Sequence, residues 1–310
     1  MKVIFLGTPS FAVPTLEMLN KYYEVVLVVT KKDARGNHNK IIYSPVKEKA
    51  LELGLQLFQP ERLKDDYKPL LETGAHMLVT AAYGEFIPSV VLKEFKYKLN
   101  VHGSLLPKRR GGAPIQRALM EGDTYTGVTI MEMAKKMDAG KIYSQRRLEI
   151  LPSDNSTTLF QKLSIIGRDL LKETLPSIIA GTNQGVKQNE EEATFSYVLT
   201  KADEIIDFNK TSIDLFNQIR ALALEPGAYF KFKDQPYKIL ASKVVETNKD
   251  ALPGTILSLN KEFVIKTKDK ALSILKIKPA GKKTMDVLSF LNGQRIFKEQ
   301  DIITCGDKLV

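Results

Sequence analysis

The chain has 310 residues, of which 43% are hydrophobic and 26% are charged, with a formal net charge of +10. This length exceeds one ordinary domain of about 100–200 residues and fits two domains. No apolar run approaches the roughly 20 residues that span a bilayer, and the single cysteine, Cys305, excludes an internal disulfide and a cysteine-based metal cluster.

The first elements of the chain predict a parallel sheet. We expect Lys2 to Leu6 to be a buried strand, Phe11 to Asn20 a helix with one apolar face, and Val25 to Val29 a second strand. The first apolar run is too short for the core of a signal peptide, so we expect a cytoplasmic protein with no membrane partner. The β-α-β order predicts a doubly wound, Rossmann-like α/β fold with a mostly parallel sheet.

The turn after the first strand, Gly7 to Ser10, lacks the Gly-x-Gly-x-x-Gly pattern of dinucleotide sites, which weakens a dehydrogenase interpretation. Residues 30–45 are polar and show no apolar periodicity, which predicts an exposed loop. The expected elements that complete the first domain, residues 1–186, are helices near 45–53, 66–72, 114–121 and 158–179 and strands near 55–58, 76–81, 126–133 and 141–150.

The last third of the chain has a different pattern. Residues 187–208 are predicted to be a linker, because the stretch around 181–192 is polar and acidic and has no period. Residues 209–310 are expected to form a second domain with a helix at 211–224, followed by five short strands at 228–232, 237–244, 254–259, 263–267 and 271–279. Such strands predict a small OB-like β-barrel, a platform for nucleic acid, although a plain β-domain has the same pattern.

The charge is unevenly distributed. Residues 1–187 carry 27 basic and 19 acidic side chains (+8), residues 188–230 carry 3 and 8 (−5), and residues 231–310 carry 16 and 9 (+7). Basic surfaces attract phosphates in a salt-dependent way, which suits an RNA partner. A lysine-rich surface that serves only solubility would give the same composition.

Two polar residues at a strand end form the candidate catalytic site. Asn100 and His102 are two apart, so both side chains leave one face of an extended strand. The loop Ser104 to Pro107 follows and is expected to offer free N–H groups to a ligand. With Asp138 to orient the imidazole and favour its charged form, the set can stabilise an oxyanion and manage protons, which predicts acyl transfer. A strand-end histidine with a purely structural role fits the two residues equally well.

Several runs of this sequence resemble the methionyl-tRNA branch of the 10-formyltetrahydrofolate-dependent formyltransferases. They are Asn100 to Pro107, Lys108 to Arg117, Gly122 to Asp123 with Thr126 to Ile130, and Pro279 to Met285. The resemblance covers nearly the whole chain. It implies transfer of the formyl group from 10-formyltetrahydrofolate to the α-amino group of methionyl-initiator tRNA, with no metal, and we expect a monomer.

The resemblance also implies roles for individual residues. The catalytic set is Asn100, His102 and Asp138. The implied folate contacts are Ser104, Leu105, Leu106 and Pro107, with Tyr83, Gly84, Phe86 and Ile87 around the pterin ring. The expected tRNA contacts are Arg35, Lys40, Lys282 and Lys283.

Some positions depart from the family pattern. Asn37 stands where an important arginine would align, Ala139 replaces a threonine after the aspartate, and the chain has no tryptophan near Glu225. Two other functions therefore remain open. One is a formyltransferase or deformylating hydrolase that acts on a nucleotide, a sugar nucleotide or water. The other is a non-catalytic RNA-binding protein, and turnover of the folate separates it from the enzymes.

Overall fold

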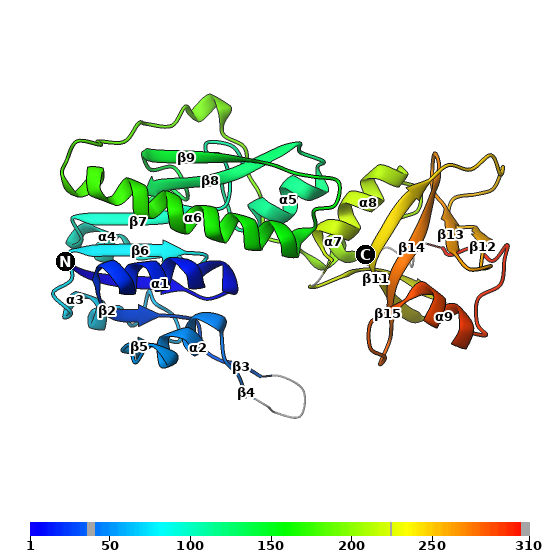
Figure 1. Cartoon of the computed structure of the whole chain (residues 1–310), viewed down its shortest axis with the longest axis horizontal. Helices are drawn as coiled ribbons and strands as arrows, with labels where there is room; N and C mark the ends of the chain where they lie inside the picture. The colour runs from blue at the N-terminus through cyan, green and yellow to red at the C-terminus, as the bar shows by residue number, and fades with distance from the viewer. Residues whose placement is uncertain (36–40, 224, 305–310) are drawn as a thin grey trace. The chain divides into compact units, whose positions relative to one another are not determined.

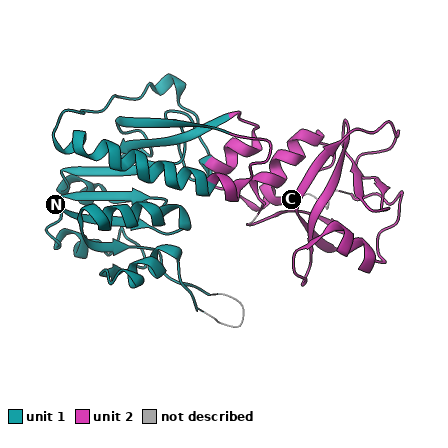
Figure 2. Cartoon of the chain, viewed as in Figure 1, with its two compact units in different colours: residues 1–114, 125–149, 160–197 teal, residues 115–124, 150–159, 198–310 magenta. Residues whose placement is uncertain are grey.

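The structure is a computed structural model that describes residues 1–35, 41–223 and 225–304. Lys40, an expected tRNA contact, lies outside these ranges, as do Asn37 and Cys305. The chain forms two compact units (Figure 2): the first unit comprises residues 1–114, 125–149 and 160–197, and the second unit comprises residues 115–124, 150–159 and 198–310. The division at residues 186 and 208 inferred from the sequence stays a prediction.

The first unit is built on a seven-stranded sheet in the order β5-β2-β1-β6-β7-β8-β9. Its strands are β1 (Lys2–Gly7), β2 (Glu24–Val29), β5 (Leu57–Phe58), β6 (Met77–Ala81), β7 (Tyr97–His102), β8 (Tyr125–Glu132) and β9 (Ile142–Glu149). The first five of these pair in parallel, and β8 runs antiparallel to both β7 and β9. The carboxyl ends of β6 and β7 therefore meet at one edge.

Helices cover the two faces of this sheet. They are α1 (Val13–Tyr22) after a 3-10 turn (Ser10–Ala12), α2 (Pro45–Glu52), α3 (Lys68–Leu71), α4 (Ser89–Glu94) and α6 (Ser156–Ile179). Figure 1 shows α1 and α6 across one face. Gly167 of α6 lies so close to β7 that an added Cβ would come within 2.7 Å of the Val101 Cγ1 atom. Since Val101 faces α6, Asn100 and His102 leave the opposite face of β7.

On this face of the sheet, the neighbouring strands β1 and β6 pack against α3 and α4. Leu70 of α3 and Val91 of α4 are fully buried in one core cluster with Ile4 and Leu78 of the sheet. Apolar residues that recur every second position along a strand give it such a buried face. The sheet consequently holds the candidate residues on rigid, buried strands.

The predicted Rossmann-like fold is confirmed. The prediction of an exposed loop at 30–45 was incomplete, because β3 (Ala34–Arg35) and β4 (Ile41–Ile42) pair antiparallel within it. Two paired residues are too few to show the period of two that reveals a strand. The helix α4 was also missing from the expected elements, because six residues are too few to show a helical period.

The second unit has an antiparallel sheet in the order β10-β11-β14-β13-β12, with β15 paired to β14. Its strands are β10 (Ala228–Phe232), β11 (Gln235–Val245), β12 (Ile256–Ser258), β13 (Phe263–Lys266), β14 (Ala271–Pro279) and β15 (Met285–Asp286). Its helices are α5 (Pro114–Met120), α7 (Lys201–Glu204), α8 (Ser212–Ala221) and α9 (Val287–Gly293), with a further 3-10 turn (Glu190–Glu192) in the first unit.

Aromatic rings fill the core of this second sheet. Phe230 stacks on Tyr237 with ring centroids 5.5 Å apart, and Phe297 meets the Tyr237 ring edge at 4.9 Å. Such offset and edge contacts add to the free energy gained by burying the rings. The curled antiparallel sheet confirms the OB-like prediction. In the part of the chain that the structure describes, no helix is both long and apolar enough to cross a membrane.

Candidate active site

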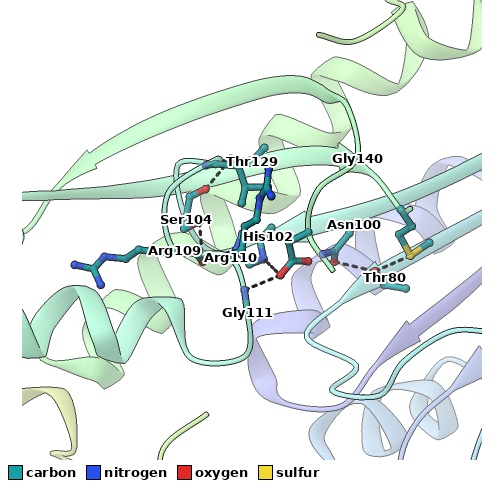
Figure 3. Close-up of polar contacts among 12 residues, drawn as sticks. Thr80, Asn100, His102, Ser104, Arg109, Arg110, Gly111, Thr129 and Gly140 are labelled. Atoms are coloured by element: carbon teal, nitrogen blue, oxygen red, sulfur yellow. Dashed lines mark hydrogen bonds and ion pairs between the residues drawn. The ribbon is translucent and has the colours of Figure 1, made fainter. Parts of the chain in front are cut away.

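The end of β7 carries the first two residues of the candidate site. Asn100 lies beside Thr80 of β6 in the parallel register, and the Thr80 hydroxyl donates to Asn100 Oδ1 at 2.8 Å (Figure 3). This bond holds the amide oxygen towards β6 and turns the Nδ2 donor the other way. Asn100 can therefore present an N–H donor at the edge of the sheet.

The His102 ring is only 6% exposed, and both of its nitrogens face oxygen atoms. Nε2 lies 3.1 Å from the Arg109 carbonyl oxygen, which can only accept, so Nε2 carries a proton. Nδ1 lies 3.8 Å from Asp138 Oδ2, which is too long for a hydrogen bond and within the range of an ion pair. A doubly protonated ring would thus have an acceptor on each side.

Asp138 lies in the loop between β8 and β9, and its carboxylate is fixed by the backbone. Its Oδ2 accepts a hydrogen bond from the Gly111 N–H at 2.8 Å (Figure 3). The residue has a φ of +49°, in the left-handed region, and Ala82 (+47°) and Arg109 (+61°) share this conformation. Such angles also occur in turns of the second unit, as at Lys233 and Asp234, and at functional sites the surrounding structure must hold them. Asp138, Ala82 and Arg109 surround the end of β7 or bond to groups there.

The structure brings the three predicted catalytic residues together from β7 and a loop 36 positions further along the chain. The predicted free N–H groups in the loop after β7 need a correction. The Leu106 N–H donates to the Thr129 hydroxyl at 3.1 Å, and that hydroxyl donates to the Ser104 carbonyl at 2.7 Å. The correction concerns the Leu106 N–H, which bonds to its own sheet rather than to a ligand.

The side chains of the predicted folate loop differ in accessibility. Ser104 is 2% exposed and its hydroxyl donates to the Lys108 carbonyl at 2.8 Å, while Leu106 is 3% exposed. Leu105 and Pro107 are half-buried and are the two members that offer apolar surface. Folate contacts by this loop stay a prediction, in which these two side chains have the accessible positions.

The loop after β6 divides in the same way. Phe86 is 57% exposed and Gly84 is exposed, with a φ of +78° that favours glycine. Tyr83 and Ile87 are instead buried in the core cluster of the first unit. Burial raises the pKa of the Tyr83 hydroxyl above its ordinary value, with a smaller contribution from the Glu85 carboxylate. Of the four predicted pterin contacts, Gly84 and Phe86 are thus exposed and could touch a ligand, whereas Tyr83 and Ile87 are buried.

The predicted tRNA contacts lie on exposed surfaces where the structure describes them. Arg35 is exposed on the short strand β3. Lys282 and Lys283 are exposed in the turn between β14 and β15, where the Lys282 N–H donates to the Pro279 carbonyl. Lys40 lies outside the described residues. Their exposure permits contact with a phosphate backbone, and the assignment stays a prediction.

Three further residues take part in the site without a clear pattern in the sequence. They are Thr80, which orients Asn100; Gln188, which bonds to the Asp138 loop; and Arg110, which is fully buried. Arg110 belongs to a basic triplet that is typical of a solvated or phosphate-binding loop, and an ion pair with Glu190 explains its burial instead. Among the described residues, no group of three or more His, Cys, Asp or Glu is placed to hold a metal ion.

Comparison with known proteins identifies the family. Residues 1–175 match the formyl transferase family and residues 198–295 match its C-terminal domain. The chain is 45% identical over 298 residues to methionyl-tRNA formyltransferase of Streptococcus pneumoniae (strain Hungary19A-6), covering 94% of this chain and 95% of that protein. The chain belongs to the methionyl-tRNA formyltransferases.

Solved structures share the formyltransferase fold at lower identity. An N-formyltransferase from Helicobacter canadensis in complex with folinic acid and dTDP-3-aminofucose has a TM-score of 0.66 and 24% identity, covering 88% of this chain and 98% of that one. HypX from Aquifex aeolicus in complex with tetrahydrofolic acid has a TM-score of 0.66 and 17% identity over 98% of this chain. This chain spans about half the length of HypX. At these identities the likeness concerns the fold alone.

Proposed function

We propose that this chain transfers the formyl group of 10-formyltetrahydrofolate to the α-amine of methionyl-initiator tRNA. The observation that carries the proposal is the convergence of Asn100, His102 and Asp138 at the sheet edge of a chain that is 45% identical to methionyl-tRNA formyltransferase of Streptococcus pneumoniae (strain Hungary19A-6). We include in the proposal a cytoplasmic location and a monomeric state, and size-exclusion chromatography tests the second of these.

The proposed reaction passes through a tetrahedral intermediate. The neutral α-amine attacks the formyl carbon, and the formyl oxygen becomes an oxyanion. The Asn100 amide turns its Nδ2 donor away from Thr80 and supplies one hydrogen bond to this oxygen. The intermediate collapses when the bond from the formyl carbon to N10 breaks, the amine loses one proton, and tetrahydrofolate leaves with a proton on N10.

His102 and Asp138 supply the charge and the proton transfer in this scheme. A doubly protonated His102 ring places positive charge beside the developing oxyanion, and Asp138 stabilises that ring from 3.8 Å. Because the Gly111 N–H holds Asp138 Oδ2, the carboxylate keeps one orientation throughout the reaction. Its other oxygen can accept the proton of the attacking amine through a water molecule.

The substrates have accessible surfaces in this arrangement. The half-buried Leu105 and Pro107 and the exposed Phe86 offer apolar and aromatic area for the pteridine and benzoyl rings of the folate. The exposed Arg35 and the pair Lys282–Lys283 offer cations for the tRNA phosphates. The folate and tRNA residues named here belong to the proposal.

The test follows the label of a 10-formyltetrahydrofolate that carries a radioactive formyl group. The acceptors offered are charged initiator tRNA, charged elongator tRNA, a dTDP-linked amino sugar and water. We expect label in the initiator tRNA, and kcat lowered by roughly 10²–10⁴-fold in His102→Ala and in Asp138→Asn, the range for loss of a positioned acid–base group. Preferential labelling of the amino sugar, or near-wild-type turnover of either variant with tRNA, would refute the proposal.

A further inference from the structure

A segment outside the predicted catalytic motifs runs directly beside the site. Residues 187–197, here called the clasp segment, pair with the turn that follows the folate loop. The Arg109 N–H donates to Thr194 Oγ1 at 2.9 Å, the Arg110 N–H to the Thr194 carbonyl at 2.8 Å, and the Ser196 N–H to the Arg110 carbonyl at 2.7 Å. The Arg109 carbonyl is also the acceptor for His102 Nε2. The clasp segment therefore fixes the turn that holds the imidazole.

The side chain of Arg110 joins the clasp segment to the interior. Arg110 is 0% exposed, and its guanidinium makes paired contacts with Glu190, 2.8 Å from Nη2 to Oε1 and 3.1 Å from Nη1 to Oε2. Its Nε and Nη2 also donate to Gln188 Oε1, at 3.1 and 2.8 Å. Lys136 bonds to the same Glu190 carboxylate from outside. The planar fork of the guanidinium thus fixes both clasp side chains at once.

The amide of Gln188 carries this constraint to the catalytic loop. Because Oε1 accepts from Arg110, the Nε2 group faces the other way, where it donates to the Asp138 carbonyl at 2.8 Å and to the Gly140 carbonyl at 2.7 Å. Both amide protons are thereby used. Asp138 has a φ of +49°, a conformation that costs free energy and persists only where the surroundings impose it. Gln188 bonds to the backbone of this very residue.

We propose that Gln188 and Arg110 are positioning residues that set the Asp138 carboxylate against His102. The inference rests on the proposed function, in which Asp138 meets the reacting groups. The two ends of the network meet the two members of the pair. Gln188 donates to the Asp138 carbonyl. Thr194 of the clasp segment binds the N–H groups of Arg109 and Arg110, on either side of the carbonyl that accepts from His102. The clasp segment, which the sequence predicts to be part of a linker, then helps to position the catalytic residues.

A role limited to stability accounts poorly for this arrangement. Removing a charged side chain from water costs free energy, and well-packed apolar side chains in place of a buried ion pair often give equal or greater stability. A buried guanidinium that holds an amide in one orientation supplies geometry that an apolar group cannot supply. In positioned catalysis, a displacement of about 1 Å costs up to about 10²-fold in rate.

The test compares three single variants of the full-length protein. Gln188→Ala removes the amide, and Gln188→Glu keeps the oxygen that Arg110 binds but places a second acceptor opposite the Asp138 and Gly140 carbonyls. Gln184→Ala is the matched control. Gln184 is an exposed glutamine just before the clasp segment, and its side chain donates a local hydrogen bond to the Gly181 carbonyl. Each is assayed for kcat, for KM of both substrates and for the midpoint of thermal unfolding.

We expect both Gln188 variants to lower kcat by about 10–100-fold, with each KM within about threefold of wild type. Their unfolding midpoints should fall below that of Gln184→Ala, because buried partners of Gln188 lose hydrogen bonds, but both variants should remain folded at the assay temperature. In an Asp138→Asn background, Gln188→Ala should add less than about threefold, because residues that act as a unit are not additive. We do not expect Gln188→Glu to recover the kcat lost in Gln188→Ala. The glutamate keeps the bond to Arg110 but cannot donate to the Asp138 and Gly140 carbonyls.

Specific results would overturn the inference. Wild-type kcat in Gln188→Ala while Asp138→Asn is inactive overturns the positioning role and leaves the proposed function intact. The positioning role is also overturned if Gln188→Ala lowers kcat by the same factor in the Asp138→Asn background as in wild type. It is likewise overturned if the fall in kcat equals the fall in the fraction of folded protein. Wild-type turnover of Asp138→Asn itself refutes the proposed catalytic set and, with it, the positioning role.

Discussion

Thr80→Val tests whether a single hydroxyl orients the catalytic amide. Thr80 is 5% exposed, and its Oγ1 donates to Asn100 Oδ1 at 2.8 Å. Valine has nearly the same shape but cannot donate, so the amide oxygen loses its partner and the amide can rotate. The rotated amide would present oxygen, rather than an N–H group, to the developing oxyanion.

The size of the effect follows from two limits. A fully buried acceptor left without a partner costs about 1–3 kcal/mol. Asn100 is half-buried, so the corresponding factor of roughly 5- to 150-fold, at 1.36 kcal/mol per factor of ten, is an upper limit. Complete loss of one oxyanion donor lowers kcat by about 10²–10³-fold, and Asn100→Ala measures that limit here. We therefore expect Thr80→Val to lower kcat by about 10–100-fold.

The assay is single-turnover formylation of charged initiator tRNA at saturating folate, with unfolding by urea measured in parallel. Thr80→Ser keeps the hydroxyl and serves as the control, with an expected kcat within about threefold of wild type. Equal rates for the Val variant and wild type would show that Thr80 does not orient Asn100. Equal losses in the Val and Ser variants would assign the effect to packing rather than to the hydrogen bond.

Three further predictions concern other parts of the structure. Arg110, and less strongly Lys136, lowers the pKa of Glu190 from 4.5 to about 2. The ion pair therefore stabilises the folded protein above pH 4.5, and this stabilisation is lost as pH falls towards 2. Urea unfolding of Glu190→Gln across this range should show a flatter pH dependence than wild type, and an equal pH dependence would contradict the ion pair. Gly140→Ala places a Cβ 1.9 Å from a backbone oxygen of β8 and should lower both stability and kcat, whereas Gly293→Ala, which meets nothing within 4 Å, should lower neither. Replacing the exposed Lys282 and Lys283 by alanine should raise KM for tRNA at constant kcat. In tRNA titrations, the slope of log affinity against log salt concentration should become shallower by about 0.9 per lost phosphate contact. An unchanged slope would show that the pair does not contact the tRNA phosphates.

Much of the architecture was encoded in local patterns. Continuous apolar runs predicted the longer strands of the first unit, and alternating apolar residues predicted those of the second unit, to within a few residues, as in β10 (Ala228–Phe232). The two-residue strands β3, β4 and β15 are too short to show either pattern. The spacing of Asn100 and His102 determined that both side chains leave one face of β7. The residues of the candidate pair were therefore visible before the fold was known.

Other features depended on segments that meet only in the folded chain. The Leu106 N–H was expected to be free and is bound by Thr129, which comes from the next strand in the sheet. Thr80 orients Asn100 because the register of β6 and β7 makes them neighbours. Neither register nor partner is specified within a short window of sequence, because each follows from the packing of whole strands.

The clearest division concerns Arg110. By itself, the basic triplet Lys108 to Arg110 before two glycines predicts exposed cations that contact the folate tail or RNA phosphate, or that are simply solvated, since an isolated buried charge is too costly. Tertiary structure reverses this expectation, because Gln188 and Glu190, 78 and 80 positions further along the chain, supply the oxygens that replace water around the guanidinium. The sequence determined which strands form and which face carries the catalytic pair. Only the tertiary structure brought the clasp segment to the Asp138 loop, because the free energy of burying Arg110 depends on both of its distant partners being present together.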